Sequence, residues 1–277
     1  MSDGHSPTAA LRAPDPLVRR LRDAGCVFAE DEATILRRSA TDAGHLESLC
    51  LRRISGEPLE HVVGWVAFGR LRLHVGSGVF VPRQRSLLLA HTAVAAARSR
   101  GTPIVLEAFA GAAPIAASVR RFVPQARVHA TEVDAVAAGY ARRNLGADAG
   151  VYCGAEFAAV DESLRGRIDV IAAVPPYVPT TAADLLPREA VEHEPGRALF
   201  AGVHGLDHIR HLIDGAGDWL VDGGRLMIEM NTGQSTTAAA HANRAGYGVR
   251  VHHGGDGQTA VLSLRNRQGH RPAQARR

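Results

Sequence analysis

The spacing of apolar residues along the chain changes twice, and each change marks a different kind of structure. In residues 15–57 the apolar positions Leu17, Leu21 and Ala24 recur at intervals of three and four, which is the period of an amphipathic helix. Two further helices are expected in this stretch, at 31–36 and 46–54. The pattern therefore predicts a small helical domain at the front of the chain.

Residues 58–85 show the two-residue alternation that is typical of strands. Apolar residues alternate with glycine and polar residues on either side of Gly69-Arg70, which has the composition of a turn. The apolar positions are Trp65, Val66, Phe68, Leu71, Leu73 and Val75. We predict a β-hairpin within 59–82 that links the helical domain to the rest of the chain.

Residues 86–265 alternate short apolar runs with helical segments. Strands are predicted at 104–106, 127–131, 168–173 and 224–229, followed by an antiparallel pair at 246–252 and 259–264. Helices are predicted at 115–122 and 135–145. This alternation indicates an α/β fold with a doubly wound, mostly parallel sheet. Such sheets bind ligands at the carboxyl ends of their strands, so the chemistry is expected at that edge.

Composition and charge exclude several functions. The 277 residues carry a formal charge of +4, and residues 266–277 alone hold four arginines and no acid. We expect this basic tail and residues 1–14 to be disordered. The rest shows no basic stripe, so no nucleic-acid partner is expected. The sequence shows no apolar run long enough for a membrane span and no signal-peptide pattern, so we expect no membrane association and a cytoplasmic protein. Three scattered cysteines fit a reducing compartment and predict no metal site.

The first candidate site is the loop that follows the strand at 104–106. Glu107 comes directly after this strand, and Phe109, Ala110 and Gly111 follow it. Small residues between a strand and a helix let a ligand approach the backbone closely. Gly111 is the one glycine in this loop, so a plain strand-to-helix turn explains these residues equally well.

The second candidate is Glu132, which ends the next strand 25 residues after Glu107. An acid at this place can accept hydrogen bonds from the two vicinal hydroxyls of a ribose. The alternative role is an acid at the start of the following helix, but Asp134 fits that N-cap position better. We predict that Glu132 contacts a cofactor that contains a ribose.

The third candidate is the loop Val174-Pro175-Pro176-Tyr177, directly after the strand at 168–173. Two prolines make the loop rigid, and their carbonyl oxygens are left free to point into a cleft. The aromatic ring of Tyr177 would form a wall of that cleft. A structural turn is the alternative interpretation.

Taken in order, several segments of the chain resemble the protein-(glutamine-N5) methyltransferase family. The matching segments are 56–64, 78–83, 175–180, 192–195, 198–199 and 205–207, with Glu229 and Gln234. Their order and spacing agree over residues 15–265, and the likeness is closest to an actinobacterial branch whose substrate is unassigned. The resemblance implies a helical substrate-recognition domain in front of a seven-stranded, Rossmann-like domain that binds S-adenosylmethionine (SAM).

The resemblance also implies roles for individual residues. The SAM-binding residues would be Glu107, Phe109, Ala110, Gly111, Glu132, Val133, Ala155, Glu156, Pro82 and Arg83. The catalytic residues would be Val174, Pro175, Pro176, Tyr177, Glu192 and Glu194. Some of these depart from the family pattern. Glu107 replaces an Asp, Phe109 and Ala113 occupy positions of glycine or small residues, and Ala155 replaces an Asp that contacts adenine, with Glu156 one place later.

Val174 is the departure with the largest chemical consequence, because the family has Asn at this position. In the family, this side chain and the next backbone carbonyl hold the substrate amide. Valine cannot form the side-chain hydrogen bonds, so we expect an N-methyltransferase of changed specificity. Its acceptor would be an amino acid, free or in a peptide, with an amide or guanidino nitrogen, and Glu192 or Glu194 would supply a carboxylate. Two alternatives stay open: methylation of glutamine in a release-factor-like protein, and an inactive chain that binds a partner.

Overall fold

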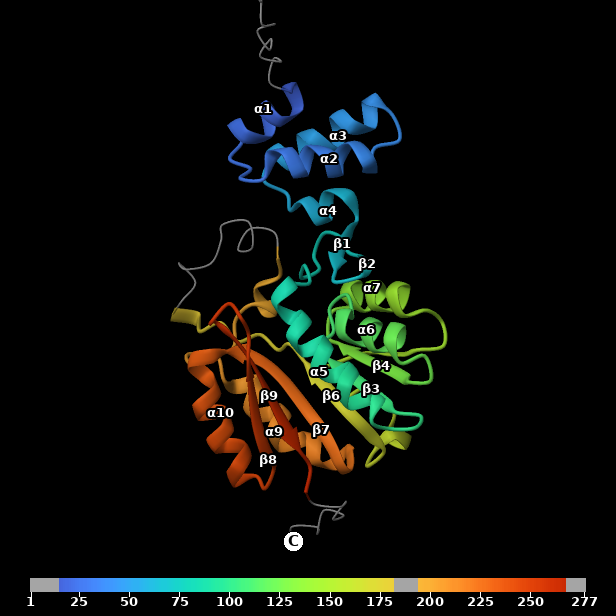
Figure 1. Cartoon of the computed structure of the whole chain (residues 1–277), viewed down its shortest axis with the longest axis vertical. Helices are drawn as coiled ribbons and strands as arrows, with labels where there is room; N and C mark the ends of the chain where they lie inside the picture. The colour runs from blue at the N-terminus through green and yellow to red at the C-terminus, as the bar shows by residue number, and fades with distance from the viewer. Residues whose placement is uncertain (1–14, 182–193, 268–277) are drawn as a thin grey trace, which may run out of the picture. The chain divides into compact units, whose positions relative to one another are not determined.

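A computed structural model of the chain describes residues 15–181 and 194–267 (Figure 1). The chain forms two compact units, Met1–Val63 and Gly64–Arg277. Each unit has a hydrophobic core of its own. None of the described helices combines the length and the apolar character that crossing a membrane requires.

The first unit contains helices around a small core. They are α1 (Pro16–Asp23), α2 (Ala29–Ser39), α3 (Ala43–Ile54) and α4 (Leu59–Val63). Asp15 starts α1, because its side chain accepts the backbone N–H of Leu17 and Pro16 fits the first helical position. Leu21 is fully buried among apolar side chains of the neighbouring helices. The amphipathic spacing thus predicted α1 to α3.

The segment expected to be a hairpin, 59–82, begins instead with helix α4, and strands occupy only its centre. Strands β1 (Trp65–Phe68) and β2 (Leu71–His74) pair antiparallel across a two-residue turn. The first unit consequently extends to Val63, beyond the boundary expected at residue 57. The apolar residues of α4 are three and four positions apart, but so short a segment is ambiguous between helix and strand.

The second unit is built on a seven-stranded sheet in the order β5-β4-β3-β6-β7-β9-β8. Its strands are β3 (Ile104–Ala108), β4 (Arg127–Glu132), β5 (Gly150–Cys153), β6 (Ile168–Ala173), β7 (Leu220–Asn231), β8 (Gly248–His253) and β9 (Thr259–Arg265). Strands β3 to β7 are parallel, and β9 runs antiparallel to β7 and β8. The predicted doubly wound sheet with an antiparallel end is confirmed. Strand β5 was missed because this short edge strand contains no buried apolar run.

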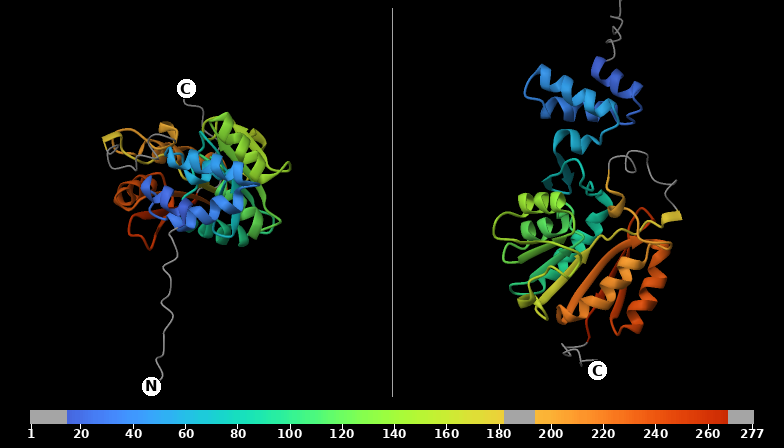
Figure 2. Two further views of the ribbon diagram at one scale, coloured as in Figure 1. Left: turned by 90° about the horizontal axis from the view of Figure 1, so that it is seen from above. Right: turned by 180° about the vertical axis from the view of Figure 1, so that it is seen from behind.

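Helices cover both faces of the sheet, as a mostly parallel sheet requires. One face carries α5 (Leu87–Arg98), α6 (Pro114–Phe122) and α7 (Ala135–Leu145), and the other carries α9 (Asp207–Gly215) and α10 (Thr232–Arg244). In Figure 2 the green helices α6 and α7 lie apart from the orange and red helices α9 and α10. Short 3₁₀ turns lie at Gln84–Ser86, Glu162–Leu164, Gly196–Ala198 and Ala216–Asp218.

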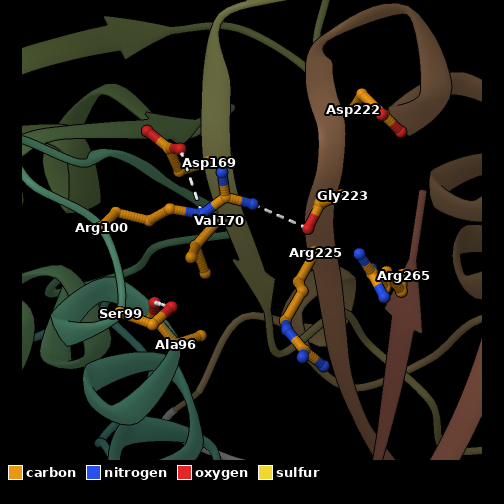
Figure 3. Close-up of a pocket in the computed structure, with 9 residues that line it drawn as sticks. All are labelled: Ala96, Ser99, Arg100, Asp169, Val170, Asp222, Gly223, Arg225 and Arg265. Atoms are coloured by element: carbon orange, nitrogen blue, oxygen red, sulfur yellow. Dashed lines mark hydrogen bonds and ion pairs between the residues drawn. The ribbon is translucent and has the colours of Figure 1, made fainter. Parts of the chain in front are cut away.

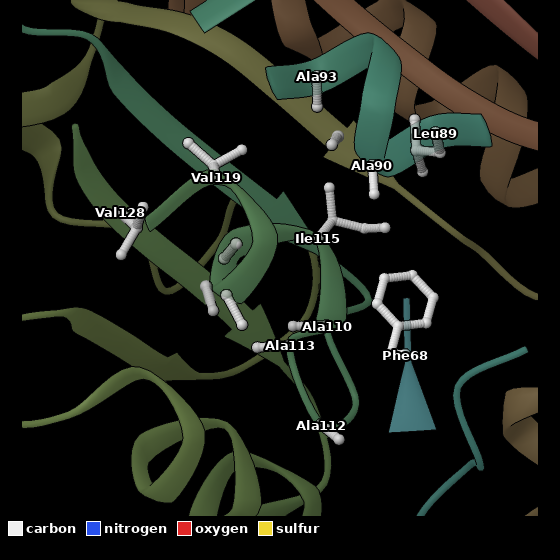
Figure 4. Packing of buried hydrophobic residues seen from close by; sticks show 14 of the residues in the cluster. Phe68, Leu89, Ala90, Ala93, Ala110, Ala112, Ala113, Ile115, Val119 and Val128 are labelled. Carbon is white, nitrogen blue, oxygen red and sulfur yellow. The ribbon is translucent and has the colours of Figure 1, made fainter. Parts of the chain in front are cut away.

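Small side chains let α6 pack closely on the sheet. Ala110, Ala112 and Ala113 are buried where the loop after β3 turns into α6. Phe68 of β1 points toward Ile115 of α6, and both side chains are buried in the same cluster (Figure 4). The hairpin β1–β2 therefore covers the start of α6, next to the first candidate loop.

Asn266, which was expected to begin a disordered tail, is buried. Its side chain donates to the carbonyl oxygen of Leu220 at 3.3 Å, and its backbone N–H donates to Gly224 at 2.9 Å. The backbone pairing of the antiparallel strands thus continues past the predicted boundary, which polar composition alone does not reveal. Residues 1–14 and 268–277 lie outside the described residues.

Asn144, near the end of α7, joins the hairpin to the loop before α6. Its Oδ1 accepts the backbone N–H of His74 at 2.7 Å, and its Nδ2 donates to the carbonyl oxygens of His74 at 2.9 Å and Ala112 at 2.8 Å. A carboxamide offers an acceptor and two donors in one plane. A single side chain therefore satisfies three backbone groups in two segments.

We expect Asn144→Ala to lower the free energy of unfolding by about 2–3 kcal/mol, because three hydrogen bonds of about 1 kcal/mol each are lost. Urea denaturation measures this change. Arg143→Ala, at the exposed neighbouring position, is the matched control and should change stability by less than about 0.5 kcal/mol. Equal losses in the two variants would assign the effect to the helix and not to the amide.

Candidate functional site

The candidate residues gather at the carboxyl ends of the parallel strands. Glu107 lies near the end of β3, Glu132 ends β4, and Glu156 follows β5. Val174 directly follows β6, and Glu229 lies near the end of β7. Neighbouring parallel strands end at the same edge of a sheet, so loops that are distant in the sequence meet there. This is the edge at which the sequence predicted the chemistry.

Glu107 anchors the first candidate loop from inside the core. Its buried carboxylate accepts the backbone N–H groups of Ile115 at 3.2 Å and Ala116 at 2.6 Å. Burial raises the pKa of Glu107 to about 8, although both N–H donors favour the ionised form. Because its two oxygens bind the first turn of α6, Glu107 holds the loop in place and is covered from outside.

The loop after β3 adopts a backbone that favours glycine at three alternate positions. Phe109, Gly111 and Ala113 have φ values of 55°, 53° and 58°. For a residue with a Cβ this left-handed conformation costs roughly 1–2 kcal/mol. A Cβ added at Gly111 would meet no atom within 4 Å, so the backbone there borders open space. The buried Ala110 lies between the first two of these positions.

Glu132 connects the loops after β3 and β4. Its Oε2 accepts the backbone N–H of Gly111 at 2.8 Å, and its Oε1 accepts that of Asp134 at 3.0 Å. Each carboxylate oxygen has a second lone pair, so Glu132 can accept further hydrogen bonds. Its neighbour Val133 is 56% exposed. Asp134 caps α7 through the N–H of Ala137, as predicted.

Glu156, one place after Ala155, points to helix α9. Its carboxylate lies 3.3 Å from Nδ1 of His208 and 3.1 Å from Nδ1 of His211. The ring of Phe109 meets His208 edge-on, with centroids 5.1 Å apart. The loops after β3 and β5 are thus joined through His208, which the sequence analysis did not single out. Among the described residues, no group of three or more His, Cys, Asp or Glu side chains is arranged to hold a metal ion.

The loop Val174–Tyr177 is fixed by contacts to α10 and to the segment before α9. Gln234 of α10 donates from Nε2 to the carbonyl oxygen of Tyr177 at 2.9 Å. Gly205 approaches so closely that a Cβ would lie 2.1 Å from the same oxygen, and its φ is +67°. Both prolines of the loop are buried, while Val174 is half-buried against the cluster that lies under α5. These contacts hold the loop rigid.

Glu194, a predicted catalytic carboxylate, is bound to Arg83. One guanidinium nitrogen of Arg83 lies 2.6 and 2.7 Å from the two carboxylate oxygens of Glu194, whose side chain is 2% exposed. Pro82, next to Arg83, is buried. Arg83 and Glu194, which were expected to contact cofactor and acceptor, therefore bind each other. Glu192 lies outside the described residues.

Glu229 was matched as part of a segment but not predicted as a site residue. Its side chain is fully buried, and its Oε1 accepts the hydroxyl of Ser86 at 3.0 Å. Nε of Arg85 lies 3.7 Å from the same oxygen. Oε2 has no hydrogen-bond partner among the described residues, and burial raises the pKa of Glu229. The sequence did contain a sign of this site, because Glu229 is a single acid within the apolar run of β7. Acids are rarely buried unless they are paired, so an acid at such a position suggests a functional role.

A cavity of about 500 Å³ lies at the other end of the sheet, near the beginnings of β6 and β7 (Figure 3). Its charged lining residues are Arg100, Arg225, Arg265, Asp169 and Asp222. Arg100 donates to the carbonyl oxygen of Gly223 at 2.8 Å and lies 3.6 Å from Asp169. None of the predicted site residues that the structure describes lines this cavity, so it is separate from the candidate site.

Comparison with known proteins shows several relatives of similar sequence. A release factor glutamine methyltransferase of Mycolicibacterium smegmatis is 37% identical over 185 residues, which are 66% of this chain and 65% of that protein. The one from Mycobacterium leprae is 33% identical over 239 residues, or 79% of this chain and 82% of that protein. A 4-amino-L-phenylalanine/4-methylamino-L-phenylalanine methyltransferase of Streptomyces pristinaespiralis is 36% identical over 195 residues, which are 68% of this chain and 66% of that protein. No protein-family model matches the chain.

The match covers slightly less than two thirds of the length of the M. smegmatis protein. It also covers 64% of the length of a release factor glutamine methyltransferase of Streptomyces coelicolor. Among solved structures, a methyltransferase of Pyrococcus furiosus superposes with a TM-score of 0.54 and 19% sequence identity, covering 80% of this chain and 98% of that chain. At this identity the structural likeness concerns the fold alone.

Glu107 provides a test of the loop anchor through the pH dependence of stability. Its folded pKa of about 8 exceeds the ordinary value of 4.5, so the folded state holds the extra proton. The stability that Glu107 contributes is fully present below its ordinary pKa and is lost as the pH rises toward 8. At about 1.4 kcal/mol per pKa unit, we expect wild-type stability to fall by a few kcal/mol more than that of Glu107→Gln between about pH 5 and pH 8. Urea denaturation at several pH values measures this, and parallel curves for the two proteins would contradict it.

Proposed function

We propose that this chain, which belongs to the protein-(glutamine-N5) methyltransferase family, is a SAM-dependent N-methyltransferase with a small amino-acid-like acceptor. Val174 carries the proposal, because it stands where the family pattern has an amide-binding Asn. Its side chain packs half-buried against the core and offers no polar atom. The S. pristinaespiralis relative, named for 4-amino-L-phenylalanine, supports an amino-acid acceptor.

The residues at the strand ends fit SAM on its ribose side. Glu132 has lone pairs left for two vicinal hydroxyls, and Gly111 leaves room for a ligand beside its backbone. The adenine side would be formed by Phe109 and His208 in place of the Asp that Ala155 replaces. These residues would hold the cofactor between the loops after β3, β4 and β5.

When bound, SAM supplies an electrophilic methyl group on sulfonium. Methyl transfer needs an in-line approach of the acceptor, so positioning is the main task of the protein. The carbonyl oxygen of Pro175 would accept an N–H of the acceptor, and Tyr177 would wall the pocket. The hydrogen bond from Gln234 and the close approach of Gly205 keep this loop in one conformation.

Two other functions have support from particular observations. Family membership favours methylation of glutamine in a release-factor-like protein. The strained non-glycine residues Phe109 and Ala113, together with Ala155, favour an inactive chain that binds a partner. SAM binding separates the inactive chain from the two enzymes, and the acceptor separates the enzymes from each other.

Glu132→Ala should weaken SAM binding by about 1.5–3 kcal/mol, since hydrogen bonds from the ribose to a charged group are lost. Calorimetric titration with SAM measures the affinity. Glu162→Ala, which removes an exposed acid paired with Arg165, should bind like the wild type. Unchanged affinity in folded Glu132→Ala would exclude this residue from the cofactor site, and no binding by the wild type would favour the inactive chain.

Val174→Asn tests the choice of acceptor. We expect the wild type to methylate 4-amino-L-phenylalanine or L-arginine and to transfer little methyl to a release factor that carries the glutamine. Val174→Asn should raise transfer to glutamine and lower the native activity, because it adds a polar group that the native acceptor does not pair with. The assay is radiolabelled methyl transfer from SAM, with Val174→Ala as the apolar control. Efficient methylation of the release factor by the wild type would establish the glutamine function instead.

A further inference from the structure

The second unit contains a buried carboxyl oxygen that has no partner among the described residues. Glu229 exposes none of its surface, and only its Oε1 receives the hydroxyl of Ser86. A buried acceptor left without a hydrogen bond lowers the stability of the folded protein. Such groups are rare in native proteins and call for a functional explanation. Oε2 of Glu229 is therefore a candidate contact for a ligand.

Glu229 is the neighbour of the Val174–Tyr177 loop across the sheet. Ala173 of β6 pairs with Ile228 of β7, so Val174 and Glu229 are the next residues along two parallel strands. Side chains in register on adjacent strands point to the same face. Val174 packs against the cluster that also holds Met227, two residues before Glu229. Because valine has no N–H or O–H to donate, it leaves Oε2 free for an acceptor held by the loop.

No nearby cation among the described residues fully compensates the negative charge of an ionised Glu229. Arg85 approaches only Oε1, at 3.7 Å, and its side chain is 43% exposed, so solvent weakens the attraction. Burial is the main cause that raises the pKa of Glu229, with Asp256 adding to the rise and Ser86 and Arg85 opposing it. Burial also raises the pKa of Tyr177, on which Arg85 and Glu229 act with opposite signs. A carboxyl in this environment holds a proton more readily than an exposed glutamate does.

We propose that Oε2 of Glu229 accepts an N–H of the methyl acceptor and takes up the proton that the nitrogen loses. This inference rests on the proposed function. The lone pair of a neutral nitrogen forms the new N–C bond, the S–C bond of SAM breaks with its electron pair going to sulfur, and the N–H proton passes to Oε2. The role expected of Glu192 or Glu194 thus falls to Glu229, since Arg83 already holds Glu194.

The inference sets a chemical requirement for the acceptor. A neutral nitrogen with at least one N–H fits the oxygen of Glu229, and an aryl amine such as 4-amino-L-phenylalanine meets this requirement. A tertiary amine has no N–H to give. The dimethylated form of 4-amino-L-phenylalanine should therefore not be methylated further, although it carries a lone pair.

Glu229→Gln is the direct test, since glutamine keeps the size of the side chain and an oxygen for Ser86. With 4-amino-L-phenylalanine as the acceptor, we expect kcat to fall by about 100-fold or more, the usual effect of losing a general base. The affinity for SAM, measured by calorimetry, should stay unchanged. Wild-type kcat/KM should rise with pH through the pKa of Glu229, and this rise should be absent in Glu229→Gln. Glu229→Asp should recover part of the rate, and Glu162→Gln is the control that keeps the full rate.

Each outcome decides the inference. Wild-type turnover with an equal rate in Glu229→Gln would overturn it and leave the proposed function standing. Loss of SAM binding together with turnover would make Glu229 a structural residue and would also overturn it. If Glu229→Gln does not fold, trimethylation of the aryl amine by the wild type overturns the inference, and its arrest at two methyl groups supports it. No transfer to 4-amino-L-phenylalanine would overturn this inference, and no transfer to L-arginine as well would overturn the proposed function.

Discussion

The hydrogen bonds between the Glu107 carboxyl and the first turn of α6 fix the edge of the sheet on which the site depends. They tie the end of β3 to the start of its helix, and the loop between them must then turn within a few residues. That loop provides the N–H of Gly111 to Glu132, which in turn orients the start of α7. A buried carboxyl with a pKa of about 8 therefore organises two strands and two helices.

The tight turn has a cost that the rest of the site must offset. Phe109 and Ala113 hold left-handed backbone conformations without the freedom of glycine. Burial of Ala113 and the ring contact between Phe109 and His208 stabilise these conformations. The same contact, with the pairing of Glu156 to α9, links loops that would surround a nucleoside. In the proposed SAM site, the residues assigned to adenine thus differ more from the family pattern than Glu132, which is assigned to the ribose.

At the next pair of strands, one apolar side chain changes the chemistry of its neighbour. The side chain of Val174 forms no hydrogen bond, and Glu229, its neighbour across the sheet, keeps a buried oxygen that has no partner within 15–181 and 194–267. The sequence predicts that Glu192 or Glu194 supplies the carboxylate that acts on the acceptor. The carboxylate of Glu194 is held by Arg83 within the protein. In the proposed acceptor site, the polar group is therefore supplied by β7 and not by the loop.

Local patterns in the chain predicted the α/β fold, the strand–helix order and the edge that carries the candidate site, because the periods of helix and strand are local properties and parallel strands end together. The sequence also placed Glu132 and Asp134 correctly at a strand end and a helix start, whereas Glu107, expected in the loop after the strand, lies within β3. The folded structure was needed to establish that α4 is a helix, that Glu194 is bound by Arg83, and that Glu229 is the neighbour of Val174 across the sheet. These features depend on contacts between residues that are far apart in the chain. Burial and register across the sheet set the partner of each polar group, and neither can be derived from the spacing of residues along the sequence.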